Sequence, residues 1–179
     1  MTQKTFDDVI LLFGGSVVDP MTHNETIAAF GEYLDQSGVR HFTARELCFP
    51  HRIEIAHKLG IYTFLPERLW WPRGAALALL ADKIRDHLGE PVRCRNWYRP
   101  PEYNAVVGGA KRSDHLTAHA FDLDYRSGSA RTKAADLLDE LDRDYPWLAL
   151  SIGTGAAFHH VGIMSPMGRR RWAYNTRGD

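Results

Sequence analysis

Apolar residues recur at helical spacing in three segments of the chain. The clearest runs from residue 72 to residue 88, where Pro72 stands at a favoured first helical position and Gly89 follows the last apolar residue. The same spacing predicts helices over residues 24–36 and 130–143. These segments are long enough to bury one apolar face each against a common core.

Between the helices, short runs rich in apolar, β-branched and aromatic residues predict strands. A further short helix is indicated after Thr43, because Glu46 follows at capping-box spacing. Helices and strands do not alternate strictly, which favours an α+β fold with a small, mainly antiparallel sheet and helices packed on one side. The predicted strands are residues 92–98, 120–125, 148–152 and 158–164.

Composition narrows the class of protein. The 179 residues are 44% hydrophobic and 25% charged, which is typical of one globular domain. The 22 Lys and Arg residues are balanced by 22 Asp and Glu residues, so no basic excess indicates a nucleic-acid partner. Two cysteines, Cys48 and Cys94, are too few for a disulfide framework or a four-thiolate zinc site. Any bound metal must use other ligands.

The first forty residues differ from the remainder. Their apolar run, residues 9–13, follows Asp7 and Asp8 and lacks the basic start and length of a signal peptide. No segment has the length of a membrane span. We therefore expect synthesis in the cytoplasm and no membrane partner. We interpret residues 1–40 as an N-terminal extension of unknown role and residues 41–179 as the functional domain.

Candidate ligands gather between residues 98 and 125, in a polar connection that ends in a strand. His115 and Asp122 lie there, and a late strand-like segment, residues 158–163, contains a third histidine. A pair of ligands on one helix, His115 with His119, is an alternative reading. It is disfavoured because Leu116 occupies the place of the catalytic Glu of such helices. Two histidines and an aspartate are a ligand set that suits zinc with one open position.

These residues resemble the signature of the zinc D-alanyl-D-alanine carboxypeptidase family, which shares its fold with the hedgehog signalling domain. In that family a Tyr-Arg turn leads to an Asn, a Gly-Gly-Ala-Lys stretch, a Ser-x-His and an Ala-x-Asp. A late strand with a His then supplies the last zinc ligand. The matching residues here are Tyr98, Arg99, Asn104, residues 108–111, Ser113, His115, Ala120, Asp122 and His160.

The resemblance implies roles for individual residues. His115, Asp122 and His160 are expected to bind zinc, and the resemblance assigns Arg99 to the developing oxyanion or the substrate carboxylate. Ser113 is expected to bind substrate, although a turn serine is the alternative. The implied activity is cleavage, as a carboxypeptidase or an endopeptidase, of peptide bonds next to D-amino acids in peptidoglycan stem peptides. The chain could then be a phage endolysin that acts on the cell wall after release.

Three departures from the family pattern concern activity. Ala118 replaces a usual Gly, so we expect the backbone there to avoid positive φ or to shift slightly. Gly162 replaces an Asp that many relatives place two residues after the last ligand, which predicts the loss of a carboxylate near the metal. No Glu lies between residues 151 and 157 to act as general base.

The general base therefore has only candidates: His159, His119 and Asp124. His159 is assigned, although strand alternation places it on the face opposite His160. These gaps keep a second hypothesis open, namely a zinc-stabilised module that binds cell-wall peptide or a protein without cleaving it. The basic run at residues 169–171 is interpreted as a solvated turn.

Overall fold

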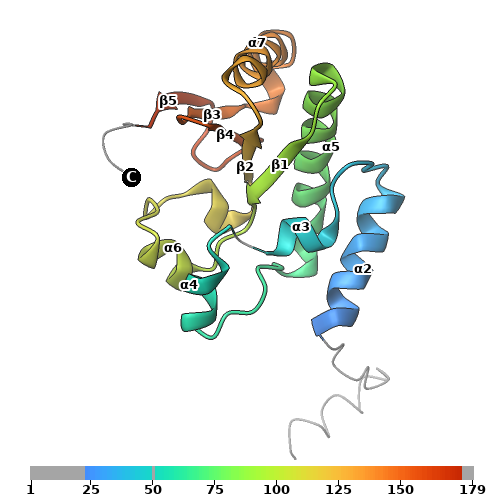
Figure 1. The fold of residues 1–179 in the computed structure, drawn as a ribbon, viewed down its shortest axis with the longest axis vertical. Helices are drawn as coiled ribbons and strands as arrows, with labels where there is room; N and C mark the ends of the chain where they lie inside the picture. The colour runs from blue at the N-terminus through green and yellow to red at the C-terminus, as the bar shows by residue number, and fades with distance from the viewer. Residues whose placement is uncertain (1–22, 50, 175–179) are drawn as a thin grey trace, which may run out of the picture.

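The protein is described by a computed structural model over residues 23–49 and 51–174. Its centre is a five-stranded sheet in the order β1-β2-β4-β3-β5 (Figure 1). Neighbouring strands are antiparallel except β3 and β5, which are parallel. The strands are β1 (Val92–Asn96), β2 (Ala120–Tyr125), β3 (Ser151–Thr154), β4 (Phe158–Gly162) and β5 (Arg170–Ala173).

Two long helices, α5 (Trp71–Leu88) and α7 (Gly128–Asp144), cover one face of this sheet. Their apolar residues share a single core with the alternate strand residues Phe121, Leu123 and Val161. The α+β class and the one-sided helical layer are therefore confirmed. The other helices are α2 (His23–Gln36), α3 (Ala44–Cys48), α4 (Ile53–Lys58) and α6 (Pro101–Val106).

The predicted helices are all present, and the cap of α3 forms as expected, with the Thr43 side chain accepting a hydrogen bond from the Glu46 backbone N–H. The strand predicted at residues 148–152 begins later in the chain than expected. A 3₁₀ turn occupies Pro146–Leu148, and β3 begins only at Ser151. Helices α4 and α6 were missed, because six residues are too few to display a periodic pattern.

The interpretation of residues 169–171 as a solvated turn is wrong. Strand β5 includes Arg170 and Arg171. Asp142 of α7 forms ion pairs with Arg171 and with Arg169, which directly precedes the strand. Arg169 Nε donates to Asp142 Oδ1 at 2.8 Å, and Arg171 Nη2 lies 2.9 Å from Asp142 Oδ2. These ion pairs attach the last strand of the sheet to the helical layer.

Helix α2 falls within residues 1–40, yet it is part of the core. Phe30 is fully buried, and its ring stacks on Trp97 with centroids 5.2 Å apart and an interplanar angle of 14°. Leu34 lies in the same core. The boundary at residue 40 stays a prediction, but residues 23–36 pack as firmly as the rest of the domain. Residues 1–22, with the apolar run at 9–13, lie outside the described part of the chain.

Among the residues that the structure describes, no helix has both the length and the apolar character needed to cross a bilayer.

Candidate metal centre

The open face of the sheet carries the centre. Asp122 of β2 and His160 of β4 are directly opposite each other in the antiparallel register. Since side chains alternate along a strand, both point away from the face that α5 and α7 cover. Asp122 is 3% exposed and His160 is likewise 3% exposed, so the two side chains are desolvated although their face carries no long helix.

His115 reaches this face from a 3₁₀ turn, Asp114–Thr117, that precedes β2. The Ser113 hydroxyl caps the turn by accepting a hydrogen bond from the His115 N–H. The indole N–H of Trp97 donates to the Ala118 carbonyl at 3.0 Å, and the Trp97 carbonyl lies 2.6 Å from His115 Nδ1. Trp97 thus holds both the end of the turn and the orientation of the imidazole.

The expectation that Ala118 would avoid positive φ is wrong. Ala118 adopts a left-handed conformation with φ 56° and ψ 26°. That conformation costs an alanine about 1–2 kcal/mol. The Ala118 side chain is fully buried in the main core, so packing of its methyl group offsets part of this cost.

The glycine pair of the connection has a packing cause. A Cβ atom on Gly109 would lie 2.0 Å from Oδ1 of Asn104, which is impossible without movement. The Asn104 side chain donates to the Ala110 carbonyl at 3.1 Å and so fastens the loop across this glycine. Asn104 and the Gly-Gly-Ala stretch therefore act together to fold the connection that presents His115.

Three ligand atoms meet in a triangle. His115 Nε2, Asp122 Oδ1 and His160 Nδ1 are each 3.1 Å from the other two. A tetrahedral zinc ion with bonds of about 2.0–2.1 Å holds its ligand atoms about 3.3 Å apart. The triangle therefore fits such an ion with almost no rearrangement. Within the described residues, this is the group whose His and Asp atoms converge closely enough for a metal.

Each of the two histidine rings forms a hydrogen bond through the nitrogen that faces away from the triangle, and these bonds favour a cation between the three ligand atoms. His115 Nδ1 donates to the Trp97 carbonyl, which leaves Nε2 as a lone pair. His160 Nε2 lies 3.2 Å from Asp114 Oδ2, an acceptor, which leaves Nδ1 as a lone pair. Two lone pairs and a carboxylate oxygen at 3.1 Å repel one another unless a positive charge lies between them. The donor set therefore fits a divalent metal.

The pKa values of His115 and Asp122 agree with this distribution. Burial would lower the pKa of His160, but its hydrogen bonds with Asp114 and Asp122 outweigh burial and raise it, so a metal must displace a proton from this ring. Burial, followed by the charge of Arg99, lowers the pKa of His115 to about 4, so its ring is neutral at pH 7 as a metal ligand must be. Burial alone would raise the pKa of Asp122, but His115, His160 and Arg99 hold it well below its usual range. Asp122 is therefore an anion in the folded protein.

Asp114 replaces the carboxylate expected to be lost at Gly162. A Cβ atom on Gly162 would lie 2.2 Å from Ser151 Oγ and 3.2 Å from Asp114 Oδ2. The Asp114 carboxylate therefore occupies the space into which an aspartate at position 162 would project. The prediction that this site lacks a carboxylate is wrong, because the turn that carries His115 supplies one.

Asp114 is held from several sides. Ser151 Oγ and Arg170 Nη2 each donate to its Oδ2 at 2.7 Å, and the Ser165 hydroxyl donates to Oδ1. Burial would raise the pKa of Asp114, but these donors and His160 outweigh it and hold the pKa well below its usual range. The side chain is a fixed anion behind His160.

A pocket of about 660 Å³ opens over the three ligands. Arg99 and Ser113 both line it, so the structure brings the predicted substrate-binding residues to the predicted metal site. The Arg99 guanidinium donates to Asp122 Oδ2, and its Nε is buried without a partner in the described residues. The other lining residues include Asp114, together with His51, Arg52, Arg95, Tyr103, Arg170 and Tyr174.

None of the three candidate bases lies in this pocket. His159 points to the helical face, where its Nδ1 is 3.2 Å from the Tyr125 hydroxyl, and its role as a catalytic base has no geometric support. His119 Nδ1 contacts Thr117 Oγ1 at 2.9 Å, and Asp124 is paired with Arg95. The strand alternation that argued against His159 is the rule that the structure obeys.

Sequence reasoning missed Asp114, Arg170 and Trp172. The Trp172 ring lies 5.0 Å from the His160 ring, and Arg170 reaches Asp114 from the same strand. Their alternation in β5 was a usable signal, since residues 170 and 172 share a face. The role of Asp114 could not be predicted from the sequence, because the direction of a side chain in a turn does not follow a periodic pattern.

Residues 67–145 match the family model described as Peptidase M15. No curated protein and no solved structure matches the chain. The matched segment contains His115 and Asp122, whereas His160 follows it and joins them only through the fold. The resemblance to the zinc D-alanyl-D-alanine carboxypeptidase family is confirmed over these residues.

Proposed function

Because residues 67–145 match a family of zinc peptidases and His160 completes the ligand triangle, we propose that the chain is a zinc-dependent peptidase. Its proposed substrate is the peptidoglycan stem peptide, cut next to a D-amino acid. The observation that carries the proposal is the set of three mutually repelling ligand atoms 3.1 Å apart beneath an open pocket.

Zinc bound by His115, Asp122 and His160 would polarise the scissile carbonyl and lower the pKa of a bound water to roughly 7. The protein's own contribution is positioning. Arg99 Nε and Arg170 Nη1 are both buried without a partner in the described residues, and both side chains line the pocket. Two unsatisfied guanidinium donors beside the ligands suit the carboxylate end of a peptide and the oxyanion that develops on its carbonyl.

Proton transfer needs a group within reach of the pocket. Within the described residues no Glu lines it, and Asp114 is engaged by four partners. The side chains left that can exchange a proton are His51, which is exposed, and two tyrosines, Tyr103 and Tyr174. Burial raises the pKa of both tyrosines, that of Tyr174 to about 12. A tyrosine that keeps its proton suits a proton donor, and the exposed imidazole of His51 suits a proton acceptor.

A non-catalytic zinc-stabilised module that binds cell-wall peptide is the second candidate. The specific observation in its favour is the placement of His159 on the opposite face, which leaves the pocket without the base that sequence assigned. Both candidates use the same ligands, so metal content alone does not separate them.

Turnover separates the two candidates. Zinc-loaded protein is incubated with purified peptidoglycan and with a stem peptide ending in D-alanyl-D-alanine, and new termini are identified by mass spectrometry. A peptidase releases products that disappear with a chelator and return with zinc. Release of one terminal D-alanine identifies a carboxypeptidase, and release of internal fragments identifies an endopeptidase. Co-sedimentation with the wall at full zinc occupancy without any product would reject the peptidase in favour of the binding module.

A further inference from the structure

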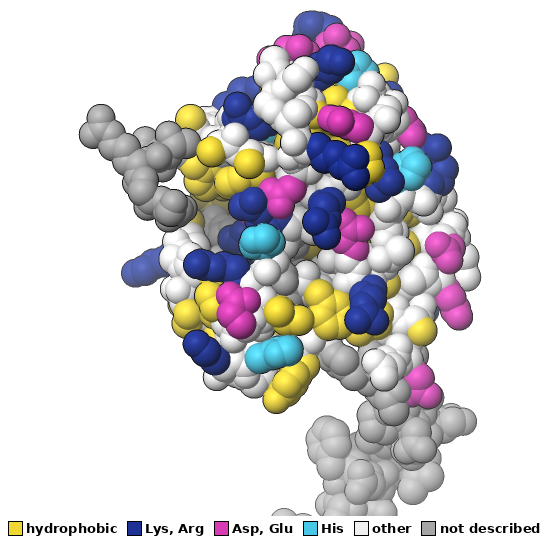
Figure 2. All heavy atoms as spheres, viewed as in Figure 1, with side chains coloured by type: hydrophobic (Ala, Val, Ile, Leu, Met, Phe, Trp, Pro, Cys, Tyr) yellow, Lys and Arg dark blue, Asp and Glu magenta, His cyan; other side chains and the backbone are white. Residues whose placement is uncertain are grey.

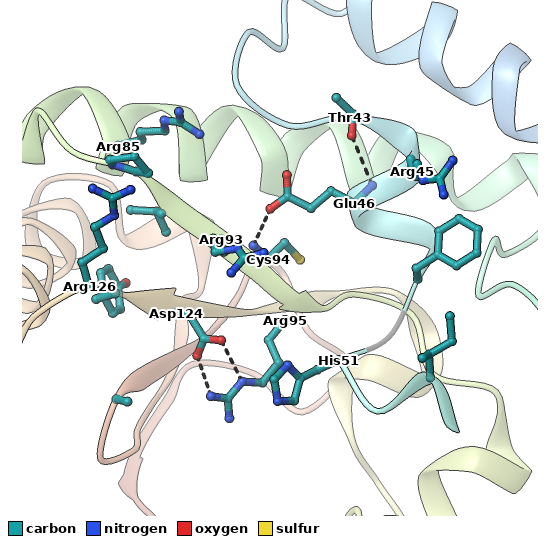
Figure 3. Close-up of a pocket in the computed structure, with 16 residues that line it drawn as sticks. Thr43, Arg45, Glu46, His51, Arg85, Arg93, Cys94, Arg95, Asp124 and Arg126 are labelled. Atoms are coloured by element: carbon teal, nitrogen blue, oxygen red, sulfur yellow. Dashed lines mark hydrogen bonds and ion pairs between the residues drawn. The ribbon is translucent and has the colours of Figure 1, made fainter. Parts of the chain in front are cut away.

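A second hollow, of about 1170 Å³, lies beside β1 (Figure 3). It is bordered by α3, by the chain just after α3, by the end of α5 and by the ends of β1 and β2. We call it the arginine groove, because five arginines line it against two acids, Glu46 and Asp124. The arginines are Arg45, Arg85, Arg93, Arg95 and Arg126.

Both acids of the groove are already engaged. Glu46 Oε1 accepts a hydrogen bond from the Cys94 backbone N–H at 2.9 Å, as Figure 3 shows. Asp124 accepts from Arg95 Nε at 3.1 Å, and its other oxygen lies 2.7 Å from Arg95 Nη2. Asp124 is therefore paired with Arg95, whereas the charge of Glu46 offsets only part of the charge of Arg85 and Arg93.

Four arginines are left with spare donors. Arg45 lies over the Phe49 ring at 5.7 Å, a contact that leaves its N–H groups available. Arg85, Arg93 and Arg126 form no ion pair within residues 23–49 and 51–174. The whole chain has no net charge, so this is a local concentration of positive charge. Figure 2 shows Lys and Arg side chains spread over one face of the molecule, with Asp and Glu side chains between them.

The groove continues into the metal pocket. His51 and Arg95 line both hollows, so a chain seated over the ligands would pass these two residues and enter the groove. The edge of β1 is closed to an added strand at two points. Glu46 takes the Cys94 N–H, and the His51 N–H donates to the Arg95 carbonyl at 3.1 Å. Recognition in the groove therefore falls to side chains.

We propose that the arginine groove binds carboxylates of an acidic peptide substrate at positions several residues from the bond that is cut. Guanidinium groups form paired hydrogen bonds with carboxylates, and a row of them selects a peptide that carries several acids. A peptide is favoured over other polyanions because the groove shares its border with the pocket of a proposed peptidase. This inference rests on the proposed function and adds to it a second set of contacts between the chain and its substrate.

The test compares two synthetic stem peptides with the same free C-terminus, one with free internal carboxylates and one with these carboxylates amidated. Binding to the full zinc-loaded chain is measured by fluorescence anisotropy at low temperature, with peptide integrity checked by mass spectrometry. The free-acid peptide is expected to bind about tenfold more tightly, a preference that added salt reduces. Equal binding of the two peptides would overturn the proposal.

Variants locate the preference. Arg93→Gln/Arg126→Gln should abolish it, whereas Lys83→Gln/Lys133→Gln, which removes two exposed charges outside both hollows, should leave it intact. Arg45→Gln/Arg126→Gln repeats the test at a second pair if the first variant folds poorly by circular dichroism. A preference that survives in both groove variants excludes the groove as its origin.

A third arm tests the source of the anion. A phosphodiester polymer of the cell wall and unlabelled free-acid peptide are each added as competitors of the bound acidic peptide, and their concentrations are expressed per negative charge. Displacement by the polymer at a lower concentration than by the peptide would overturn the choice of a peptide. Because binding is measured apart from cleavage, the groove preference can hold while turnover is absent. That outcome would reject the peptidase alone.

Discussion

Asp114 Oδ2 lies 3.2 Å from Nε2 of His160, on the side of the ring opposite Nδ1, which faces His115 and Asp122. A carboxylate in this position fixes the tautomer and the orientation of a histidine ligand and increases its basicity. The two residues are 46 positions apart, and they meet because the turn before β2 folds over the end of β4. The ligand triangle is therefore oriented from behind by a residue outside it.

Replacement of Asp114 by Asn should weaken zinc binding by about 10- to 100-fold, because the amide keeps the shape but loses the charge behind His160. Competition titration with a zinc indicator measures the effect on the purified chain. Asp124→Asn is the matched control, since Asp124 is also on the open face of β2 but is paired with Arg95 outside the triangle. Equal losses in the two variants would count against a specific role for Asp114.

Zinc affinity lost on removal of the Asp114 carboxylate should be recovered when a carboxylate is placed at position 162 instead. Gly162→Asp alone should lower thermal stability, because its Cβ would lie 2.2 Å from Ser151 Oγ and its charge would face Asp114. In the background Asp114→Ser/Ser151→Ala, the same Gly162→Asp change should raise zinc affinity. No recovery in this triple variant would show that the two positions are not equivalent sites for the carboxylate.

One zinc ion per chain is expected by elemental analysis of untagged protein, since the 3.1 Å triangle matches tetrahedral ligand spacing. His115→Ala should abolish binding and also lower the midpoint of thermal unfolding, because the metal stabilises only the folded chain. His57→Ala, an exposed histidine of α4, serves as the control. Metal content near zero that added zinc does not restore would remove the metal centre altogether.

Arg99→Gln should reduce turnover by about 10² or more while zinc affinity falls much less. The reason is that Arg99 contacts Asp122 Oδ2, whereas the oxygen that faces the other ligands is Oδ1. Arg52→Gln removes an exposed arginine from the same pocket and should change turnover little. A loss of turnover that full zinc loading restores would mean that Arg99 acts only by positioning the ligand.

Phe30→Ala should cost about 3–5 kcal/mol of the free energy of unfolding, the usual cost of removing a buried phenylalanine ring. The stacked partner of this ring, Trp97, also carries the carbonyl that orients His115, so zinc affinity should fall as well. Denaturant unfolding and zinc titration measure the two effects. Leu79→Ala, at a side chain 41% exposed on α5, is the control. Unchanged zinc affinity in a destabilised variant would separate α2 from the metal centre.

Asp142 should make stability depend on pH. Burial opposes its ionisation, but hydrogen bonds from Arg169 and Arg171 outweigh this and lower its pKa in the folded state. The resulting stability is present above the unfolded pKa of about 3.9 and is lost as pH falls through the lower, folded pKa. Wild type should therefore exceed Asp142→Asn in stability at pH 7, and the gap should narrow below pH 4. A gap that is constant with pH would assign the effect to packing alone.

Sequence patterns predicted the long elements and indicated the candidate ligands His115 and Asp122, because each follows a local rule. Helical spacing identified α5 and α7, and the motif containing His115 and Asp122 is one continuous segment. The residues that surround the ligands, such as Asp114 and Arg170, were not predicted, because no local sequence pattern determines the direction of their side chains. Arg170 and Asp114 meet across 56 positions, and only the parallel pairing of β5 with β3 brings them together. The groove beside β1 was likewise hidden, since its arginines come from α3, α5, β1 and the end of β2.

The Phe30–Trp97 stack also bears on the order of assembly. The centre draws on both ends of the described chain, since α2 supports Trp97, Trp97 orients His115, and Arg170 of β5 reaches Asp114 behind His160. Most of these contacts join segments far apart in sequence, which form late when loop closure limits folding. Zinc uptake should therefore mark the completion of folding, and a refolding chain should acquire the metal together with its last tertiary contacts.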